Sequence, residues 1–177
     1  MQEFIQKTLS DFISAYRTSY SSNHVLMYLI EKWKKSLDQK SSVGAVLMDL
    51  SKAFDLLIAK LHSCGFSLNS VEFFYSYLKR RKQGVKINNT ISSFQELLSG
   101  VPQGAILGPI LFNIFINDLF LFLTKVHLAN FADDNTLSTS SKNIKEILDI
   151  LESKSNQAIE WFRNNMMIVN PDKFQMI

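Results

Sequence analysis

Cysteine is nearly absent from this sequence. The 177 residues contain one cysteine, Cys64, so no internal disulfide and no cysteine-based zinc site can form within the chain. That usage fits a reducing compartment or the absence of any redox role. The three histidines, His24, His62 and His127, are scattered, and we expect them to be structural or surface residues.

Long hydrophobic runs are also lacking. The most apolar stretch, residues 106–123, is interrupted by Pro109, Asn113, Asn117 and Asp118, which is typical of a buried helix rather than a membrane span. The N-terminus has no basic segment followed by an apolar run, so we expect no secretory signal and no membrane partner. Internal repeats, low-complexity segments and linkers are not found either.

What the sequence does contain is enough apolar material for one domain, including fourteen phenylalanines. The net charge of +3 is mildly basic, which permits a polyanionic partner without requiring one. Predicted strands and helices are mixed without a regular βαβ alternation, which favours an α+β fold. We expect a first helix that is N-capped within residues 21–23 and runs to about Gln39. Further helices are expected over 56–64 (stopped by Gly65), 71–80 (capped by Asn69 or Ser70), 110–122 and 144–164. Strands are expected over 43–49 and from 167, with a hairpin of 84–88 and 91–94.

Two of these helices have apolar stripes at helical spacing, which predict the faces that they bury. The stripe of the first helix is Val25, Leu26, Tyr28, Leu29, Trp33 and Leu37, and that of the last is Ile144, Ile147, Leu148, Leu151, Ala158, Ile159 and Phe162.

The two adjacent acids Asp133 and Asp134 stand out because apolar and polar residues alternate on both sides of them. The alternation predicts a β-hairpin with the acids at its tip. Two neighbouring carboxylates repel unless a cation or a proton joins them. Mg²⁺ is the usual cation because it prefers hard oxygen ligands. An ordinary surface turn is the alternative interpretation of this pair taken alone.

A third acid, Asp49, ends the predicted strand 43–49. If the acidic hairpin lies beside that strand, three carboxylates converge at one rim of the sheet. With two metal ions, such a cluster is typical of phosphoryl or nucleotidyl transfer.

Two further segments have alternative interpretations. The basic run Lys79, Arg80, Arg81 and Lys82 either stabilises a helix C-terminus or contacts phosphate. The loop 99–109, rich in glycine and proline, is either a plain turn or a close approach of backbone to a ligand.

Four segments, in the same order, resemble motifs of reverse transcriptases from non-LTR (LINE-like) retrotransposons. The first is Val46–Asp55, the second Gly100–Asn113 with its continuation to Leu119, the third Phe131–Asp134, and the last runs from Trp161 to Lys173. The weaker stretch Ser14–Arg17 and the helix after it resemble the part before the first motif. The resemblance covers nearly the whole chain.

The resemblance implies a palm-like antiparallel sheet with helices packed on one face, incomplete fingers and no thumb. Residues 43–177 would form the palm and residues 1–42 a remnant of the fingers. It also implies RNA-directed DNA polymerisation with two Mg²⁺ ions (Mn²⁺ as an alternative), an RNA template, a DNA primer and dNTP substrates. The oligomeric state is left open, and only the family's way of life suggests nucleus or cytoplasm.

Site residues follow from the same resemblance. Asp49 and Asp133 would be the principal metal ligands with Asp134 beside them, and Phe54 would exclude a ribose 2′-OH. Gln103 and Gly104 would line the nucleotide and template pocket, while Lys173 would donate a proton to pyrophosphate or contact phosphate. The run 79–82 would contact the nucleic-acid backbone.

The chain departs from the family where Phe54–Asp55 runs directly into Leu56, which resembles a deletion beside the steric gate. We expect such a change to threaten the placement of Asp49 and Phe54, and we expect weak or no processive synthesis by this chain alone. Two alternatives remain: an inert nucleic-acid-binding remnant of a decayed element, and a viral RNA polymerase palm, against which Phe54 argues.

Overall fold

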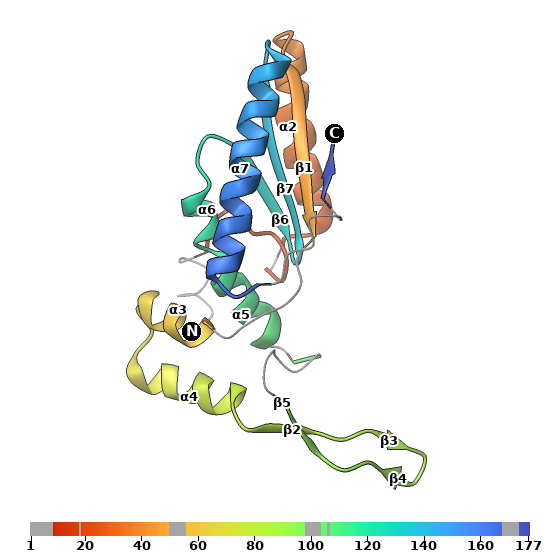
Figure 1. Ribbon diagram of the computed structural model, residues 1–177, viewed down its shortest axis with the longest axis vertical. Helices are drawn as coiled ribbons and strands as arrows, with labels where there is room; N and C mark the ends of the chain where they lie inside the picture. The colour runs from red at the N-terminus through yellow and green to blue at the C-terminus, as the bar shows by residue number, and fades with distance from the viewer. Residues whose placement is uncertain (1–8, 18, 50–55, 98–103, 106, 168–173) are drawn as a thin grey trace.

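A computed structural model describes the chain except for residues 1–8, 18, 50–55, 98–103, 106 and 168–173. The described elements form a long body built on a sheet, with helices and a projecting β-ribbon at one end (Figure 1). Their bounds are α2 Ser22–Asp38, β1 Ser42–Asp49, α3 Leu57–Ser63, α4 Leu68–Leu78, β2 Arg81–Gln83, β3 Lys86–Ile87, β4 Thr90–Ile91, β5 Gln95–Leu97, α5 Leu107–Ile116, α6 Leu119–Phe122, β6 His127–Phe131, β7 Asp134–Ser141, α7 Ile144–Asn164 and β8 Gln175–Met176.

The main sheet has the strand order β6-β7-β1-β8, and its pairs are antiparallel. β1 pairs with β7 along its whole length, from Ser42 opposite Ser141 to Asp49 opposite Asp134. The predicted strand 43–49 and the predicted hairpin around Asp133 are therefore confirmed. β8 was not predicted: the chain returns to the outer side of β1, where Ala45 and Ile177 exchange backbone hydrogen bonds of 2.8 and 2.9 Å.

Helices cover both faces of this sheet. A Cβ on Gly44 would lie 2.5 Å from Cγ2 of Ile147, so α7 packs directly on the face to which Gly44 belongs. Val43, the residue before Gly44, belongs to the other face and is paired with Ser140 of β7. On that face, Ser36 of α2 donates a hydrogen bond to Ser140 at 3.0 Å. The α+β palm-like fold is confirmed, and α2 adds a cover on the face opposite α7.

The core lies between the sheet and α5 and α7. Its fully buried members include Leu111 and Phe115 of α5 and Leu151 and Phe162 of α7. Phe115 also contacts Trp161 edge-on, with ring centroids 6.2 Å apart.

The single helix predicted over 110–122 is wrong, because the structure has two helices there. α5 ends at Ile116 and α6 begins at Leu119. The two residues between them make tertiary contacts instead: the Asn117 side chain accepts a hydrogen bond from the Ser10 backbone at 2.7 Å, and Asp118 pairs with Lys60.

The predicted helical stripes are correct in part. In α7, Ile147, Leu151, Ala158 and Phe162 are buried, whereas Ile144 and Leu148 are 63% and 47% exposed. In α2, Leu29 is buried, but Leu26 and Leu37 are more than half exposed, contrary to the prediction. The side chain that the prediction missed is Trp161, which is buried.

Caps fix several helix ends. Ser21 and His24 form a capping box at the start of α2. Ser67, rather than the predicted Asn69 or Ser70, caps α4 by accepting a hydrogen bond from the Ser70 backbone at 3.3 Å. Gly65 follows α3 with a φ of 83°, so the predicted glycine stop is confirmed.

Lys60 of α3 connects three elements. Its ammonium group lies 2.7 Å from the backbone oxygen of Phe115 and 2.7 Å from Asp118, and it sits over the rings of Phe115 and Trp161. Desolvation by burial lowers the pKa of Lys60, and the hydrogen bond and the charge of Asp118 oppose this effect. The aliphatic stem fills space among the aromatic rings as well.

Across the described residues, no helix combines the length and apolarity that a membrane crossing needs.

Substitutions at Lys60 separate its packing from its charge. Lys60→Met keeps most of the side-chain volume and should lower the free energy of unfolding by only about 1 kcal/mol. Lys60→Ala leaves a cavity and should cost about 2 to 4 kcal/mol. Because the folded-state pKa is lowered, the unfolded chain holds more protons as the pH approaches 10.5, so the wild type should gain stability relative to Lys60→Met as the pH rises toward that value. Urea denaturation at several pH values measures both effects, and equal losses for the two variants would contradict this account.

Gly44→Ala should destabilise the packing of α7 on β1. The added methyl group would lie 2.5 Å from Ile147 and 2.9 Å from Leu151, both of which are buried. Overpacking of this kind costs about 1 to 3 kcal/mol. Thermal denaturation measures the loss, with Ser42→Ala, at an exposed position of the same strand, as the control.

Candidate active site

The acidic turn joins β6 to β7. β6 ends at Phe131 and β7 begins at Asp134, so Ala132 and Asp133 form a two-residue connection. Ala132 has a φ of 57°, in the left-handed region that tight hairpins require and that costs a residue with a Cβ about 1 kcal/mol. Asp133 and Asp134 are both exposed.

The register of the sheet brings the third acidic position to this turn. Asp49, the last residue of β1, pairs directly with Asp134, the first residue of β7. Residues that pair directly in an antiparallel ladder share one face of the sheet, with Cα atoms about 4.5 to 5.5 Å apart. Asp49 therefore lies beside the acidic turn, and the backbone register of β1 continues without interruption up to it.

Two buried asparagines support the turn from the opposite face. Asn130 and Asn135 are a directly paired couple in the hairpin and are almost completely buried. The Asn130 amide donates to the backbone oxygen of Ala132 at 2.7 Å and to the side-chain oxygen of Asn135 at 3.1 Å. The Asn135 amide donates to the backbone oxygen of Asp133 at 3.2 Å. These bonds hold both carbonyl groups of the two-residue connection.

These asparagines were not among the predicted site residues. The signal was present, because strand alternation assigns both positions to the face shared with the buried Leu128 and Leu137. An amide on a core face needs polar partners, and near a tight turn these are the turn's own carbonyls.

The backbone on the outer side of β6 is paired as well. Ile13 forms a parallel bridge with Asn130: the Asn130 backbone donates to Phe12 at 3.3 Å and the Ser14 backbone donates to Asn130 at 3.2 Å. The buried Asn113 of α5 fixes this segment by donating to the backbone oxygen of Ala15 at 2.7 Å. Residues 10–15 thus tie the acidic hairpin to the core helix.

Of the remaining predicted site residues, Phe54, Gln103 and Lys173 lie outside the described residues. Gly104 is described and is exposed, with a φ of 79°. A Cβ there would meet no atom within 4 Å, so backbone conformation rather than space explains the glycine.

The basic run does not lie on a helix as predicted. α4 ends at Leu78, Lys79 is its C-cap, and Arg81 and Lys82 belong to β2. Arg80 adopts a φ of 56° between the two elements. Arg81 donates from Nε to the backbone oxygen of Leu78 at 2.9 Å, while Lys79, Arg80 and Lys82 are exposed.

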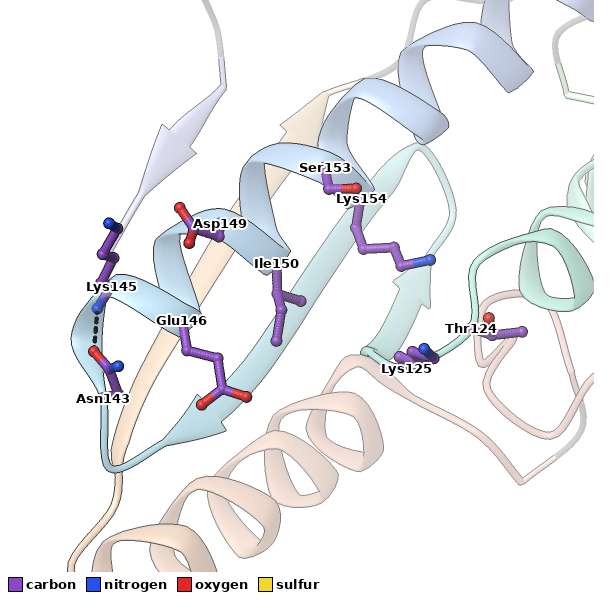
Figure 2. Close-up of a pocket in the computed structure, with 9 residues that line it drawn as sticks. All are labelled: Thr124, Lys125, Asn143, Lys145, Glu146, Asp149, Ile150, Ser153 and Lys154. Carbon is purple, nitrogen blue, oxygen red and sulfur yellow. Dashed lines mark hydrogen bonds between the residues drawn. The ribbon is translucent and has the colours of Figure 1, made fainter.

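A cavity of about 670 Å³ lies at the other end of the body, along the N-terminal half of α7 (Figure 2). Its walls carry Lys125, Lys145 and Lys154 together with Glu146 and Asp149, so charges of both signs are present. Asn143, on its rim, follows the end of β7 that is farthest from Asp134, so this cavity is separate from the acidic turn.

The carboxylates at the turn are the donor type that Mg²⁺ and Mn²⁺ prefer. Among the described side chains, a set that does not include Asp49, no three histidines, cysteines or acids gather closely enough to hold a metal. The expectation that these residues bind a metal ion therefore rests on the carboxylate oxygens and on the pairing of Asp49 with Asp134.

An antiparallel sheet with acidic positions gathered at one rim and helices packed behind it defines a polymerase palm. The chain belongs to the reverse transcriptase (RNA-dependent DNA polymerase) family, whose model matches residues 1–177.

The relatives found by sequence come from mobile elements of flies. The chain is 29% identical to a probable RNA-directed DNA polymerase from transposon BS of Drosophila melanogaster, over 95% of this chain and 20% of the relative. It is 28% identical to the RNA-directed DNA polymerase from mobile element jockey of Drosophila funebris, over 90% of this chain and 19% of the relative. These matches confirm the predicted resemblance to non-LTR retrotransposon reverse transcriptases, and the chain spans about a fifth of each relative's length.

The fold has a counterpart among solved structures. A telomerase from Candida tropicalis, solved in complex with a fragment of telomeric RNA, matches with a TM-score of 0.67 and 16% identity. The match covers 99% of this chain and 32% of the telomerase chain. At this identity the likeness concerns the fold.

Asn130→Ala should loosen the acidic turn. It removes the donor to Ala132 and leaves buried polar groups without partners, which costs about 1 to 3 kcal/mol. Hydrogen exchange should show faster exchange of the amides of residues 131–136 than in the wild type. Asn165→Ala is the control, since it removes a comparable bond to Trp161 at the end of α7. Equal exchange at the turn in both variants would show that Asn130 does not support it.

Proposed function

We propose that this chain is the palm of an RNA-directed DNA polymerase. The reaction joins the primer 3′-oxygen to the α-phosphorus of a dNTP and releases pyrophosphate, with RNA as the template and DNA as the primer. The observation that carries the proposal is the pairing of Asp49 with Asp134 beside the turn that holds Asp133. Residues 43–177 would form the palm and residues 1–42 part of the fingers.

Asp49 and Asp133, with Asp134 beside them, would hold two Mg²⁺ ions, and Mn²⁺ could replace these. When bound, such a pair of ions activates the attacking hydroxyl and stabilises charge on the triphosphate and the leaving group. The chain's own part is to hold acidic residues close together although they repel, and the paired strands and the Asn130 and Asn135 amides support that placement.

The other predicted residues would act on the substrates. The ring of Phe54 would occupy the space of a ribose 2′-OH and so select dNTPs. Gln103 and Gly104 would line the nucleotide and template pocket. Lys173 would contact the triphosphate or protonate the pyrophosphate, and Lys79, Arg80, Arg81 and Lys82 would contact the nucleic-acid backbone.

Incorporation of one dNTP on a primed RNA template tests the proposal without requiring processive synthesis. Asp133→Asn and Asp134→Asn should each lower the single-turnover rate by about a hundredfold or more, because each removes a charge that the reaction uses. Chelation with EDTA should abolish incorporation, and Mg²⁺ should restore it. Asp149→Asn, which alters an exposed acid on α7, is the matched control and should change the rate by less than about twofold.

Incorporation that survives both turn substitutions would reject the assignment of these carboxylates. RNA binding without incorporation, unchanged by Asp133→Asn, would instead support an inert nucleic-acid-binding protein.

Sugar selection is a separate test. Phe54→Ala should raise the rate of rNTP incorporation relative to dNTP incorporation by about tenfold or more, because it removes the apolar group that would clash with the 2′-OH. Competition assays with matched dNTP and rNTP pairs measure the ratio. A wild-type preference for rNTPs would favour an RNA polymerase instead.

A further inference from the structure

The β-ribbon formed by residues 81–97 projects from the end of the body (Figure 1). Near the body, β2 pairs with β5, ending at Gln83 opposite Gln95. Near the tip, β3 pairs with β4, and Val85 and Ser92 are joined by a backbone hydrogen bond of 2.9 Å. Between these two registers, Gly84 stands opposite both Ser93 and Phe94. The ribbon therefore contains a β-bulge, a device that re-aims a side chain.

The bulge places the ring of Phe94 over Gly84. A Cβ built on Gly84 would lie 3.4 Å from both Cδ1 and Cε1 of Phe94, so the ring covers the face to which position 84 belongs. Although it packs there, Phe94 remains 64% exposed. Strand alternation puts Lys82 and Lys86 on the same face, two residues before and two residues after Gly84. The result is an exposed aromatic ring with a lysine on each side.

Opposite the two lysines, this face carries one acidic and one apolar side chain. Glu96 is paired with Lys82, and Ile91, which is 56% exposed, is paired with Lys86. Val85 and Ile87 belong to the opposite face, which carries no lysine between residues 83 and 92. The opposite face carries Arg81 at its base, next to the body, so both faces have cations, but only the Phe94 face places lysines beside the bulged ring.

Charge is concentrated on this projection. Residues 79–97 contain five lysines and arginines and one acid, Glu96, whereas the whole chain has a net charge of +3. The remainder of the chain is therefore slightly acidic, so a polyanion would be attracted to the ribbon together with Lys79 and Arg80, which lead into it.

We propose that the Phe94 face of the ribbon binds an unpaired stretch of nucleic acid. One base stacks on the Phe94 ring, and the phosphates on either side contact Lys82 and Lys86, which are about 13 Å apart along an extended strand. A base paired in a duplex has no free face to offer the ring, so the site selects single strands. The inference rests on the proposed function only for the identity of the strand, a single-stranded part of the RNA template.

Fluorescence anisotropy with a labelled 12-nucleotide oligouridylate RNA tests this site in the full chain. Phe94→Ala should weaken binding by about 5- to 100-fold through lost stacking, while Phe94→Trp should bind at least as tightly as the wild type. Lys82→Gln and Lys86→Gln should each reduce the slope of log K against log salt by about 0.7. Glu96→Gln should tighten binding, because it removes the acid opposite Lys82.

The matched control is Ile87→Ala, an apolar truncation at a 68% exposed position on the opposite face of the ribbon, which should change affinity by less than twofold. Wild-type affinity in Phe94→Ala, equal losses in Phe94→Ala and Ile87→Ala, or equal affinity for a blunt duplex would each overturn the proposal. So would loss of a dimer in Phe94→Ala by sedimentation, because the face would then be an interface between copies of the chain.

The result is separable from the polymerase assignment. Asp134→Asn should lower the rate of nucleotide incorporation by about a hundredfold or more and leave oligouridylate binding unchanged. Incorporation by Asp134→Asn at the wild-type rate together with loss of binding in Phe94→Ala would reject the catalytic proposal and support the ribbon site. The opposite pair of results would reject the ribbon site alone.

Discussion

The antiparallel pairing of β1 with β7 is the interaction on which the rest of the structure depends. It brings together two segments separated by more than eighty residues and runs without a break from Ser42 opposite Ser141 to Asp49 opposite Asp134. A slip of one residue would move every side chain of β1 to the other face, so Val46 and Met48 would leave the core and Gly44 would no longer receive α7. The core and the acidic rim are therefore specified by one register.

The acidic turn adds a local cost to this arrangement. Ala132 has a positive φ, and neighbouring acids repel, so the turn needs support from elsewhere. Asn130 and Asn135 supply it from the core face, and Ile13 and Ser14 pair with the outer side of β6. The amide nitrogens of both asparagines donate hydrogen bonds there, so the buried donors under the turn have partners.

The end of the molecule beyond the sheet is organised by contacts other than strand pairing with β1. Lys60 of α3 contacts the end of α5 and the ring of Trp161 through one partly buried ammonium group. The ribbon that follows α4 has exposed apolar and basic side chains and a bulge that exposes Phe94. The body buries apolar side chains in a core, whereas most side chains of the ribbon are exposed to solvent. We therefore assign a binding partner to the ribbon.

The sequence by itself determined the strand ending in Asp49, the acidic hairpin, the stop of α3 at Gly65 and the extent of α7, because short-range periodicity and turn chemistry specify these features. Only the tertiary structure decided that Asp49 pairs with Asp134, that residues 117 and 118 separate α5 from α6, and that Leu26 and Leu37 are exposed. It also decided that Asn130 and Asn135 hold the turn and that a bulge places Phe94 over Gly84. The physical reason is that registers and side-chain partners are settled between segments distant in sequence, where local propensity carries no information.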